Sequence, residues 1–377
     1  MIGGGYAGLT AAARIGELGR AKSLTLVDAK TQFVERIRLH EIAAGSDARV
    51  FDYAAFMNTR GGSFLWGTAT IINPRERRVS VAGSDGMRHE LDYDQLVYAP
   101  GSTTDRWTIP GADAYAVGLD TVEECRALLD RLAPSRHVLV VGGGLTGIEA
   151  ACELAERIPV ISVTLAAGRA FGPSPCPGGL SPDGFDHVVA TLERLGVRII
   201  WGKRVVTLED GTAKLENGDT LPFDECIWAA GFRVPDLARN SGLKVNASGQ
   251  VVTDGALRSV SHPEIMAVGD AAEVVTDAGG IHRMSCAAGR PMGERAAESA
   301  LGLGGRFTFE YKSRCISLGR KDGLIQFVEP TDRPRNAVWT GARAARWKEY
   351  ICRRTLAGIG FDDNLGPPPD ELPAFQS

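Results

Sequence analysis

The chain has 377 residues and a formal net charge of −4, with 44% hydrophobic and 23% charged residues. This length exceeds the roughly 100 to 200 residues of one domain, so we expect two or three domains. The mild acidity excludes a general attraction to nucleic acid, and no apolar run reaches the roughly 18 residues of a membrane span. The seven cysteines include no CxxC pair, so neither a disulfide framework nor a metal site is indicated. We expect a soluble cytoplasmic protein.

The first motif is a glycine-rich turn at the start of the chain. Gly3, Gly5 and Gly8 form the pattern GxGxxG, which permits a tight turn, close approach of a pyrophosphate and close packing of helix on strand. Helical spacing follows over 9–18. Asp28 lies 20 residues after Gly8, where a carboxylate can accept hydrogen bonds from ribose hydroxyls; a capping aspartate in a loop is the alternative. Because only two residues precede the turn, we expect a trimmed N-terminus.

A second unit of the same type lies in the middle of the chain. An apolar strand over 137–141 leads into Gly142, Gly144 and Gly147, and a helix is expected over 148–157. The positive N-terminal end of that helix suits a second pyrophosphate. The repeat therefore predicts two dinucleotide-binding units in one chain.

The second unit lacks the ribose carboxylate of the first. Counting 20 residues on from Gly147 reaches Ala167, whose side chain cannot accept hydrogen bonds from ribose hydroxyls. Arg169 lies two residues further on and could pair with a 2′-phosphate, which favours NADP(H) over NAD(H). The alternative is a solvated arginine beside a degraded or unused nucleotide pocket.

Three further segments follow the glycine turns in a recognisable order. They are YDQLVYAPGS (93–102), IWAAGFRVP (227–235) and HPEIMAVGDAA (262–272). With the paired turns, they make residues 1 to 330 resemble pyridine-nucleotide-dependent flavoprotein reductases. The closest resemblance is to type II NADH dehydrogenase-like and apoptosis-inducing-factor-like proteins.

The resemblance implies an α/β fold with two Rossmann-like dinucleotide-binding domains and a small α+β C-terminal domain. We expect an FAD-binding domain over 1–110 and 245–305, an inserted NAD(P)-binding domain over 111–244, and a cap with a disordered tail over 306–377. A basic, helix-like run over 339–356 belongs to the cap. An interfacial membrane helix is one interpretation of this run, but packing on the flavin domain or on a dimer partner is favoured.

The resemblance also assigns residues to the two cofactors, FAD and NADP(H) or NAD(H). The aspartate of the family's GD pair reaches the ribityl or pyrophosphate region of the flavin, so Asp270 inherits that role. Glu149 matches a glutamate near the meeting of nicotinamide and flavin, and an ordinary first-turn glutamate is its alternative. The predicted cofactor-binding residues are Gly3, Gly5, Tyr6, Ala7, Gly8, Asp28, Arg36, Ala99, Gly101, Gly142, Gly144, Gly147, Arg169, Gly231, Gly269 and Asp270.

The stretch FVERIRLHEIAAG (33–45) falls where relatives place residues over the flavin. Arg36, Arg38 and His40 are candidates to contact the isoalloxazine or its partner substrate, and Arg38 is preferred. A cation near flavin N1 and O2 would stabilise the reduced anionic flavin, whereas solvated helix charges are the alternative. With Glu149, Arg38 and His40 form the predicted catalytic set.

Two departures from relatives narrow the chemistry. Disulfide reductases of this superfamily carry paired cysteines, but Cys152 and Cys176 each stand alone here, so buried or incidental thiols are favoured. Type II NADH dehydrogenases carry a glutamine-containing segment near the quinone, and the corresponding stretch here is MSCAAGRPMG (284–293). The missing glutamine puts quinone reduction in doubt.

We therefore expect an FAD-dependent oxidoreductase that passes a hydride from NAD(P)H to flavin N5 and on to a quinone or other small organic acceptor. The alternative is an FAD-dependent oxidase or dehydrogenase of a specialised-metabolism substrate, with a vestigial nicotinamide domain. A third hypothesis is a flavoprotein whose bound nucleotide switches partner or membrane binding. A membrane surface is an open but not favoured partner, and a homodimer stays open.

Overall fold

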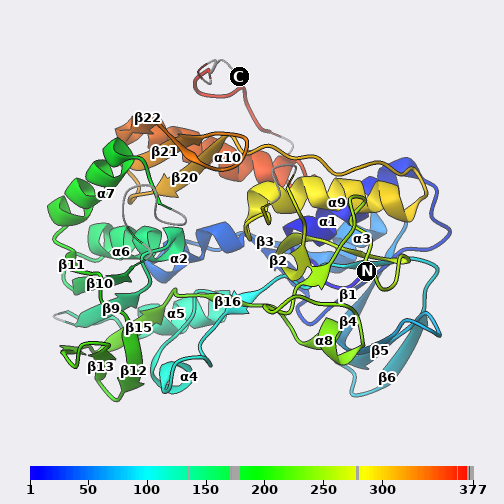
Figure 1. Ribbon diagram of the computed structural model, residues 1–377, viewed down its shortest axis with the longest axis horizontal. Helices are drawn as coiled ribbons and strands as arrows, with labels where there is room; N and C mark the ends of the chain where they lie inside the picture. The colour runs from blue at the N-terminus through cyan, green and yellow to red at the C-terminus, as the bar shows by residue number, and fades with distance from the viewer. Residues whose placement is uncertain are drawn as a thin grey trace.

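The computed structural model describes residues 1–134, 136–169, 171, 179–276, 280–362, 364–371 and 373. Figure 1 shows two α/β lobes side by side, with a smaller third unit across the top of both. This arrangement confirms the predicted fold class of two Rossmann-like units and an α+β cap. Cys176, with most of its proline- and glycine-rich loop, lies outside the described residues.

A parallel sheet forms the centre of the right-hand lobe in Figure 1. Its strands run in the order β4 (Ser63–Asn73), β1 (Thr25–Asp28), Ile2, β7 (Leu96–Tyr98) and β18 (Ile265–Ala267). In chain order this is third, second, first, fourth and fifth, which is the Rossmann arrangement. Antiparallel strands β5 (Arg78–Gly83) and β6 (Arg88–Asp92) extend β4.

Two helices cover this sheet and touch each other closely. They are α1 (Tyr6–Leu18) and α9 (Cys286–Ala300). A Cβ on Gly293 of α9 would lie 2.2 Å from the backbone oxygen of Ala7, so only glycine fits there. Shorter elements complete the lobe: β2 (Gln32–Val34), β3 (Val50–Asp52), α3 (Tyr53–Asn58), α8 (Leu237–Asn240), β17 (Val251–Val252), η2 (Gly269–Ala271) and β19 (Ala272–Glu273).

The left-hand lobe repeats the plan. Its parallel sheet runs β11 (Arg198–Trp201), β10 (Ser162–Gly168), β9 (His137–Val141) and β15 (Glu225–Trp228). The helices of this lobe are α4 (Ala112–Tyr115), α5 (Val122–Arg131), α6 (Leu145–Arg157) and α7 (Pro182–Arg194). A three-stranded antiparallel sheet flanks it, formed by β12 (Val205–Glu209), β13 (Thr212–Leu215) and β14 (Thr220–Pro222).

The chain crosses between the lobes twice, and the two crossings pair as strands. β8 (Thr103–Thr104) and β16 (Phe232–Arg233) are antiparallel neighbours. Figure 1 shows β16 between the lobes. We keep as a proposal the domain boundaries predicted after residues 110 and 244.

One segment of the first domain packs with the second lobe. The turn η1 (Arg36–Arg38) leads into the short helix α2 (Leu39–Ala43), which contacts α5 and α6. Leu39 and Ile42 are buried in the same apolar cluster as the β9 and β10 side chains. The predicted flavin-covering stretch therefore lies at the junction of the two lobes.

The C-terminal unit is an antiparallel sheet with one helix. The strands are β20 (Ser313–Ser317), β21 (Gly323–Val328) and β22 (Pro334–Thr340), and the helix is α10 (Gly341–Ala357). α10 packs on β21 through Trp347, and its end packs into the flavin lobe through Leu356. The predicted packing of this basic run on the protein is thus observed. Among the described helices, none has the length and apolarity that crossing a membrane requires.

Candidate functional site

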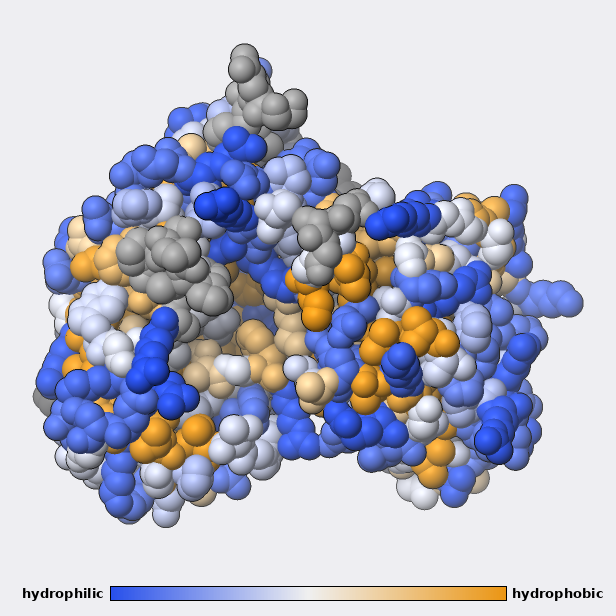
Figure 2. All heavy atoms as spheres, in the orientation of Figure 1, coloured by the Kyte–Doolittle hydropathy of each residue, from blue (hydrophilic) through white to orange (hydrophobic). Residues whose placement is uncertain are grey.

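A large cavity opens between the lobes and the cap. It has a volume of about 1720 Å³ and reaches from the first glycine turn past the second to α9 and α10. Figure 2 shows the hollow between the two lobes, with apolar residues along its walls. Pockets for a single small ligand typically measure ~300 to 1,000 Å³, so this cavity has room for more than one ligand.

The first glycine turn borders this cavity, and a different local condition explains why each position is glycine. Gly3 has φ +96°, and a Cβ there would lie 2.1 Å from the Ala99 oxygen. A Cβ on Gly8 would lie 2.0 Å from the Gly3 oxygen, so this glycine lets helix and turn pack closely. A Cβ on Gly5 would meet nothing within 4 Å. Gly5 therefore leaves open space for a ligand rather than for the protein.

The second turn reproduces this geometry residue by residue. Gly142 has φ +125°, and a Cβ there would lie 2.6 Å from the Ala229 oxygen. A Cβ on Gly147 would lie 1.9 Å from the Gly142 oxygen, whereas one on Gly144 would meet nothing within 4 Å. The two units therefore present equivalent open turns to the same cavity.

Both turns end in a helix whose first N–H groups have no side-chain cap. α1 begins directly after Gly5 and α6 directly after Gly144. Uncapped N–H groups and the positive end of the helix dipole bind anions such as pyrophosphate. Tyr6 and Ala7 belong to the first turn of α1 and line the cavity.

The carboxylate of Asp28 is held at the edge of the first turn. Its oxygens accept hydrogen bonds from the backbone N–H groups of Gly4, at 2.7 Å, and Lys30, at 2.8 Å. It lines the cavity, as predicted for a ribose-binding group. Asp270, which follows β18, also lines the cavity, and its carboxylate accepts a hydrogen bond of 2.7 Å from the Ser102 hydroxyl.

The remaining predicted glycine-segment residues divide between the cavity and its margin. Ala99, Gly101 and Gly269 line the cavity. Gly231 lies outside the lining, and its carbonyl accepts a hydrogen bond of 3.1 Å from the Asp105 N–H at the crossing between lobes.

Backbone pairing shows which residue of the second unit matches Asp28. The Gly3 N–H donates to the Val27 carbonyl at 2.9 Å, and the Gly142 N–H donates to the Ala166 carbonyl at 3.0 Å. The residue after each carbonyl is Asp28 in one unit and Ala167 in the other. The count made on the sequence is therefore correct, and no carboxylate stands at this position. Arg169 lies outside the cavity lining and pairs with Glu216.

The three candidates from the stretch over the flavin have different surroundings. Arg36 lines the cavity and is tied to Asp120, at 2.8 Å, and to the Ser102 carbonyl. Arg38 lies outside the lining, and its guanidinium is held by Glu35, Glu41 and Glu349. This geometry does not support the predicted flavin contact of Arg38. We propose that Arg38 instead fastens α2 to α10.

His40 lines the cavity and is 3% exposed. Burial lowers the pKa of its imidazole, which is therefore neutral near pH 7. Within the described residues its Nε2 atom has no hydrogen-bond partner. His40 can thus serve a bound ligand as a neutral hydrogen-bonding group, but not as the cation that was predicted.

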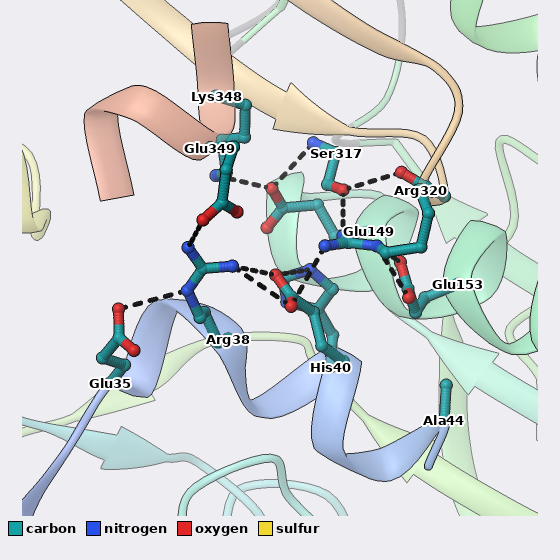
Figure 3. Close-up of polar contacts among 12 residues, drawn as sticks. Glu35, Arg38, His40, Ala44, Glu149, Glu153, Ser317, Arg320, Lys348 and Glu349 are labelled. Carbon is teal, nitrogen blue, oxygen red and sulfur yellow. Dashed lines mark hydrogen bonds and ion pairs between the residues drawn. The ribbon is translucent and has the colours of Figure 1, made fainter. Parts of the chain in front are cut away.

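Glu149 is joined by a residue that sequence reasoning missed. Lys348 of α10 enters the cavity and places its Nζ atom 2.9 Å from a Glu149 oxygen and 3.0 Å from the Cys315 carbonyl (Figure 3). The Ser317 N–H donates to the same Glu149 oxygen at 3.0 Å. The only sequence signal that could have identified Lys348 as a site residue is its position directly after the buried Trp347.

The charges of this pair stabilise each other. Burial alone would lower the pKa of Lys348, but Glu149 together with the nearby Cys352 and Cys315 thiols raises that pKa above its ordinary value. Burial alone would raise the pKa of Glu149, but Lys348, His40 and the Ser317 N–H together lower that pKa below its ordinary value. Both groups are therefore ionised near neutral pH inside the cavity wall.

A second ionic cluster supports the pair from behind. Arg320 contacts Glu41 of α2 at 3.0 Å and Glu153 of α6 at 2.9 Å (Figure 3). Burial raises the pKa of Glu153 to about 7, against the lowering effect of Arg320. These contacts hold α2, α6 and the cap together beneath Glu149.

The cysteines do not form a redox pair in the described part of the chain. Cys125, Cys152, Cys226, Cys286, Cys315 and Cys352 are all free thiols there. Cys286, Cys315 and Cys352 line the cavity, and burial raises the pKa of each, that of Cys352 to about 12. Because the thiolate is the reactive form, these thiols are poor nucleophiles.

These features fit a flavin dinucleotide on the first unit. An open glycine, an uncapped helix and Asp28 suit its pyrophosphate and ribose. His40 and Trp347 line the same cavity, and their buried Nε2 and Nε1 atoms have no hydrogen-bond partner among the described residues, as expected where a polar ring binds.

Comparisons with known proteins agree with this reading. A family model described as pyridine nucleotide-disulphide oxidoreductase matches residues 1–292. The demethylphylloquinone reductase NdbB of Synechocystis is 28% identical over 294 residues, covering 72% of this chain and 71% of the relative. The type II NADH:quinone oxidoreductase of Haemophilus influenzae is 26% identical over 358 residues, covering 80% of each chain. The solved structure of NDH2 from Plasmodium falciparum with NADH gives a TM-score of 0.78 at 14% identity, covering 96% of each chain.

Proposed function

This chain belongs to the pyridine nucleotide-disulphide oxidoreductase family, and we propose that it passes electrons from NAD(P)H through FAD to a quinone or another small organic acceptor. It is a flavin-dependent NAD(P)H oxidoreductase, and FAD is its cofactor. When bound, FAD supplies the redox chemistry, taking a hydride at N5 and releasing two electrons to an acceptor. The protein's own residues bind, orient and balance charge.

The two glycine turns divide the nucleotides between them. The α1 N-terminus, Asp28 and Asp270 hold FAD in the proposal, and the α6 N-terminus holds the pyrophosphate of NAD(P)H. Glu149 lies on the first turns of α6, so it follows the nucleotide-binding turn directly and faces the shared cavity. This arrangement places the nicotinamide end of the nucleotide towards the flavin, as hydride transfer requires.

The observation that carries the acceptor half of the proposal is the buried ammonium of Lys348. An ammonium has three N–H donors, and two of them are used by Glu149 and the Cys315 carbonyl. The third donor has no hydrogen-bond partner within the described residues and is free for an oxygen of the acceptor. A fixed donor beside an oxygen that gains negative charge stabilises that charge in a water-poor site. Glu149 keeps the ammonium protonated until the acceptor needs its proton.

Relatives support a quinone as the acceptor class. Two of them are named demethylphylloquinone reductase and type II NADH:quinone oxidoreductase. The segment at 284–293 lacks the glutamine expected for a quinone site and instead presents Cys286 and Arg290 to the cavity. For this reason the proposal includes other small organic acceptors that carry a ring oxygen.

The test separates the two half-reactions in the FAD-loaded protein. Flavin is first reduced by NADPH without oxygen and then reoxidised by a short-chain benzoquinone, in the unmodified protein and in Lys348→Met. We expect reoxidation to slow about 10- to 150-fold, because a charge-assisted hydrogen bond contributes ~1.5 to 3 kcal/mol. Flavin reduction should stay within about threefold.

The matched control is Lys321→Met, which removes an exposed lysine of the cap. It should leave both half-reactions unchanged. Equal reoxidation rates in Lys348→Met and the unmodified protein would refute the role given to Lys348. Failure of both NADPH and NADH to reduce the flavin would refute the nucleotide half of the proposal and favour an organic electron donor.

A further inference from the structure

One part of the cavity wall carries a cluster of charged and aromatic side chains that the proposed function does not use. It consists of Arg283 before α9, Phe309 and Tyr311 before β20, Arg314 on β20, and Asp332 between β21 and β22. All five residues line the cavity, and we refer to them as the Arg283 cluster. The cluster joins a segment of the flavin lobe to the cap.

The Arg283 cluster holds two guanidinium groups but one carboxylate. An Asp332 oxygen lies 2.9 Å from the Arg283 Nε atom and 3.1 Å from the Arg314 Nη2 atom. Neither arginine has a second carboxylate partner in the described part of the chain. Glu310 and Lys312 also line the cavity, as exposed residues whose opposite charges offset each other. One positive charge of the cluster is therefore not balanced by the protein.

The two arginines differ in how far the protein uses their donors. Arg314 donates to an Asp332 carboxylate oxygen at 3.2 Å, to the Gly179 carbonyl at 2.8 Å, and to the Asp332 carbonyl. Arg283 lies over the ring of Tyr311, 4.8 Å from its centroid, and its Nε atom makes no hydrogen bond among the described residues. A guanidinium that packs on an aromatic face keeps its edge for hydrogen bonds. Arg283 is therefore the member of the cluster that can bind an anionic ligand.

Aromatic rings lie beside this cation. The Phe309 and Tyr311 rings meet edge to face, with centroids 5.0 Å apart. The buried His282 ring packs against both, at 5.8 Å and 5.6 Å. A flat aromatic ligand can pack against such a wall in the same offset or edge-to-face arrangements. The wall therefore suits an aromatic ring that carries an anionic group.

The Arg283 cluster adjoins the ammonium of Lys348. Arg314 directly precedes Cys315, whose carbonyl accepts the 3.0 Å hydrogen bond from Lys348. Burial raises the pKa of Cys286, whereas the charges of Lys348 and Arg283 both act to lower it, so both cations lie near this thiol. A ligand whose anionic group meets Arg283 can therefore place a ring oxygen at Lys348.

We propose that the electron acceptor is an aromatic ring with an anionic substituent such as a carboxylate, and that Arg283 binds this substituent while Lys348 binds a ring oxygen. The inference rests on the proposed function, because it names the class of acceptor at the same site. A buried donor that a substrate leaves unpaired costs binding energy, so Arg283 selects against rings with only apolar substituents. Arg283 is thus the residue that determines acceptor specificity.

The binding test uses two probes that differ only in a carboxylate and that do not take electrons from flavin. 1-Hydroxy-2-naphthoate and 1-naphthol are titrated calorimetrically into the oxidised, FAD-loaded protein. We expect the naphthoate to bind the unmodified protein about tenfold more tightly than the naphthol. This is the lower end for a charge-assisted hydrogen bond, because the Arg283 side chain is 28% exposed. The preference should disappear in Arg283→Met, and Arg283→Lys should keep part of it.

The matched control is Arg295→Met. Arg295 pairs with Glu298 on α9, has the same 28% exposure as Arg283 and lies outside the cavity lining. Its replacement should leave the preference for the naphthoate unchanged. Equal binding of the two probes to the unmodified protein would overturn the proposal, and so would an Arg283→Met protein that keeps the full preference.

A second measurement shows whether the bound anion belongs to the acceptor. Flavin is reduced by light and EDTA without oxygen, and is then reoxidised by 1,4-naphthoquinone-2-sulfonate or by 2-methyl-1,4-naphthoquinone. The ratio of the two rate constants should fall about tenfold in Arg283→Met and stay the same in Arg295→Met. An unchanged ratio in Arg283→Met would overturn the acceptor assignment. Reduced flavin that neither quinone reoxidises would contradict the proposed function itself, which a lost probe preference alone does not.

Discussion

Replacing Lys348 by Met leaves the Glu149 carboxylate buried without its cation. The Lys348 and Glu149 side chains are 16% and 11% exposed, so water cannot take the place of the lost partner. Removing one member of a buried ion pair typically costs ~3 to 5 kcal/mol of folding stability. The carboxyl can limit this loss by taking up a proton, because burial is the largest influence that would raise its pKa.

The free-energy cost of protonating Glu149 sets the size of the expected stability loss. From the ordinary pKa of 4.5, protonation costs about 1.4 kcal/mol per pH unit, or about 3.4 kcal/mol at pH 7. In the unmodified protein Glu149 has a lowered pKa, so its contribution to stability is fully present above pH 4.5. In Lys348→Met the pKa is raised, so stability falls as pH rises above 4.5. The difference between the two proteins should therefore grow by about 3 kcal/mol between pH 5 and pH 7.

The assay is urea unfolding of the FAD-loaded protein at pH 5, 6 and 7, followed by flavin fluorescence. Lys348→Met with Glu149→Gln removes both charges and should lose the pH dependence. Lys321→Met should behave as the unmodified protein. A loss in Lys348→Met that is the same at all three pH values, and equal in the double variant, would show that packing rather than charge is responsible.

Three further predictions follow from single positions. Gly5→Ala should fold normally, since its Cβ meets nothing, but should bind FAD about tenfold less tightly. Gly8→Ala should lower the melting temperature, because its Cβ would clash with the Gly3 oxygen. Equal melting temperatures for the two variants would contradict this prediction. Burial raises the pKa of Glu153 from 4.5 to about 7, so the folded protein holds this proton more tightly and stability should fall as pH rises across that window. Glu153→Gln should remove this pH dependence and raise the free energy of unfolding at pH 8 by up to about 3 kcal/mol. An unchanged pH dependence of the free energy of unfolding would refute this prediction. Cys286→Ser with Cys315→Ser should keep both half-reactions, because these thiols are protonated, and loss of acceptor reduction alone would restore a thiol relay.

The nucleotide-binding units were predictable because their determinants are local. A glycine turn, the helix after it and the strand that follows lie within about 30 residues. In each turn the first and third glycines of the motif are required by close backbone contacts nearby, and the middle one leaves open space. The helices begin at Tyr6 and Leu145, three residues earlier than the apolar spacing indicated, because Gly5 and Gly144 end the turn directly at the helix. For the same local reason, the sequence count correctly identified Ala167 as the residue of the second unit that is equivalent to Asp28.

The lower part of the site was not predictable, because it depends on packing between distant segments. Lys348 and Glu149 are separated by 199 residues, and no local pattern indicates that α10 brings Lys348 to a side chain of α6. Arg38 was expected at the flavin only because its place in the sequence matches the stretch that relatives put over the flavin. One of its three carboxylate partners, Glu349, comes from the cap, 311 residues away. The Glu216 contact likewise joins a hairpin turn to a strand end 47 residues earlier.

The central claim is that nucleotide on the second unit reduces flavin on the first, and anaerobic mixing tests it most directly. The oxidised, FAD-loaded protein is mixed with NADPH and, separately, with NADH, and flavin absorbance is followed; a benzoquinone is then added. We predict bleaching by NADPH at least as fast as by NADH, and full recovery of absorbance with the quinone. Flavin that stays oxidised with both nucleotides would contradict the account.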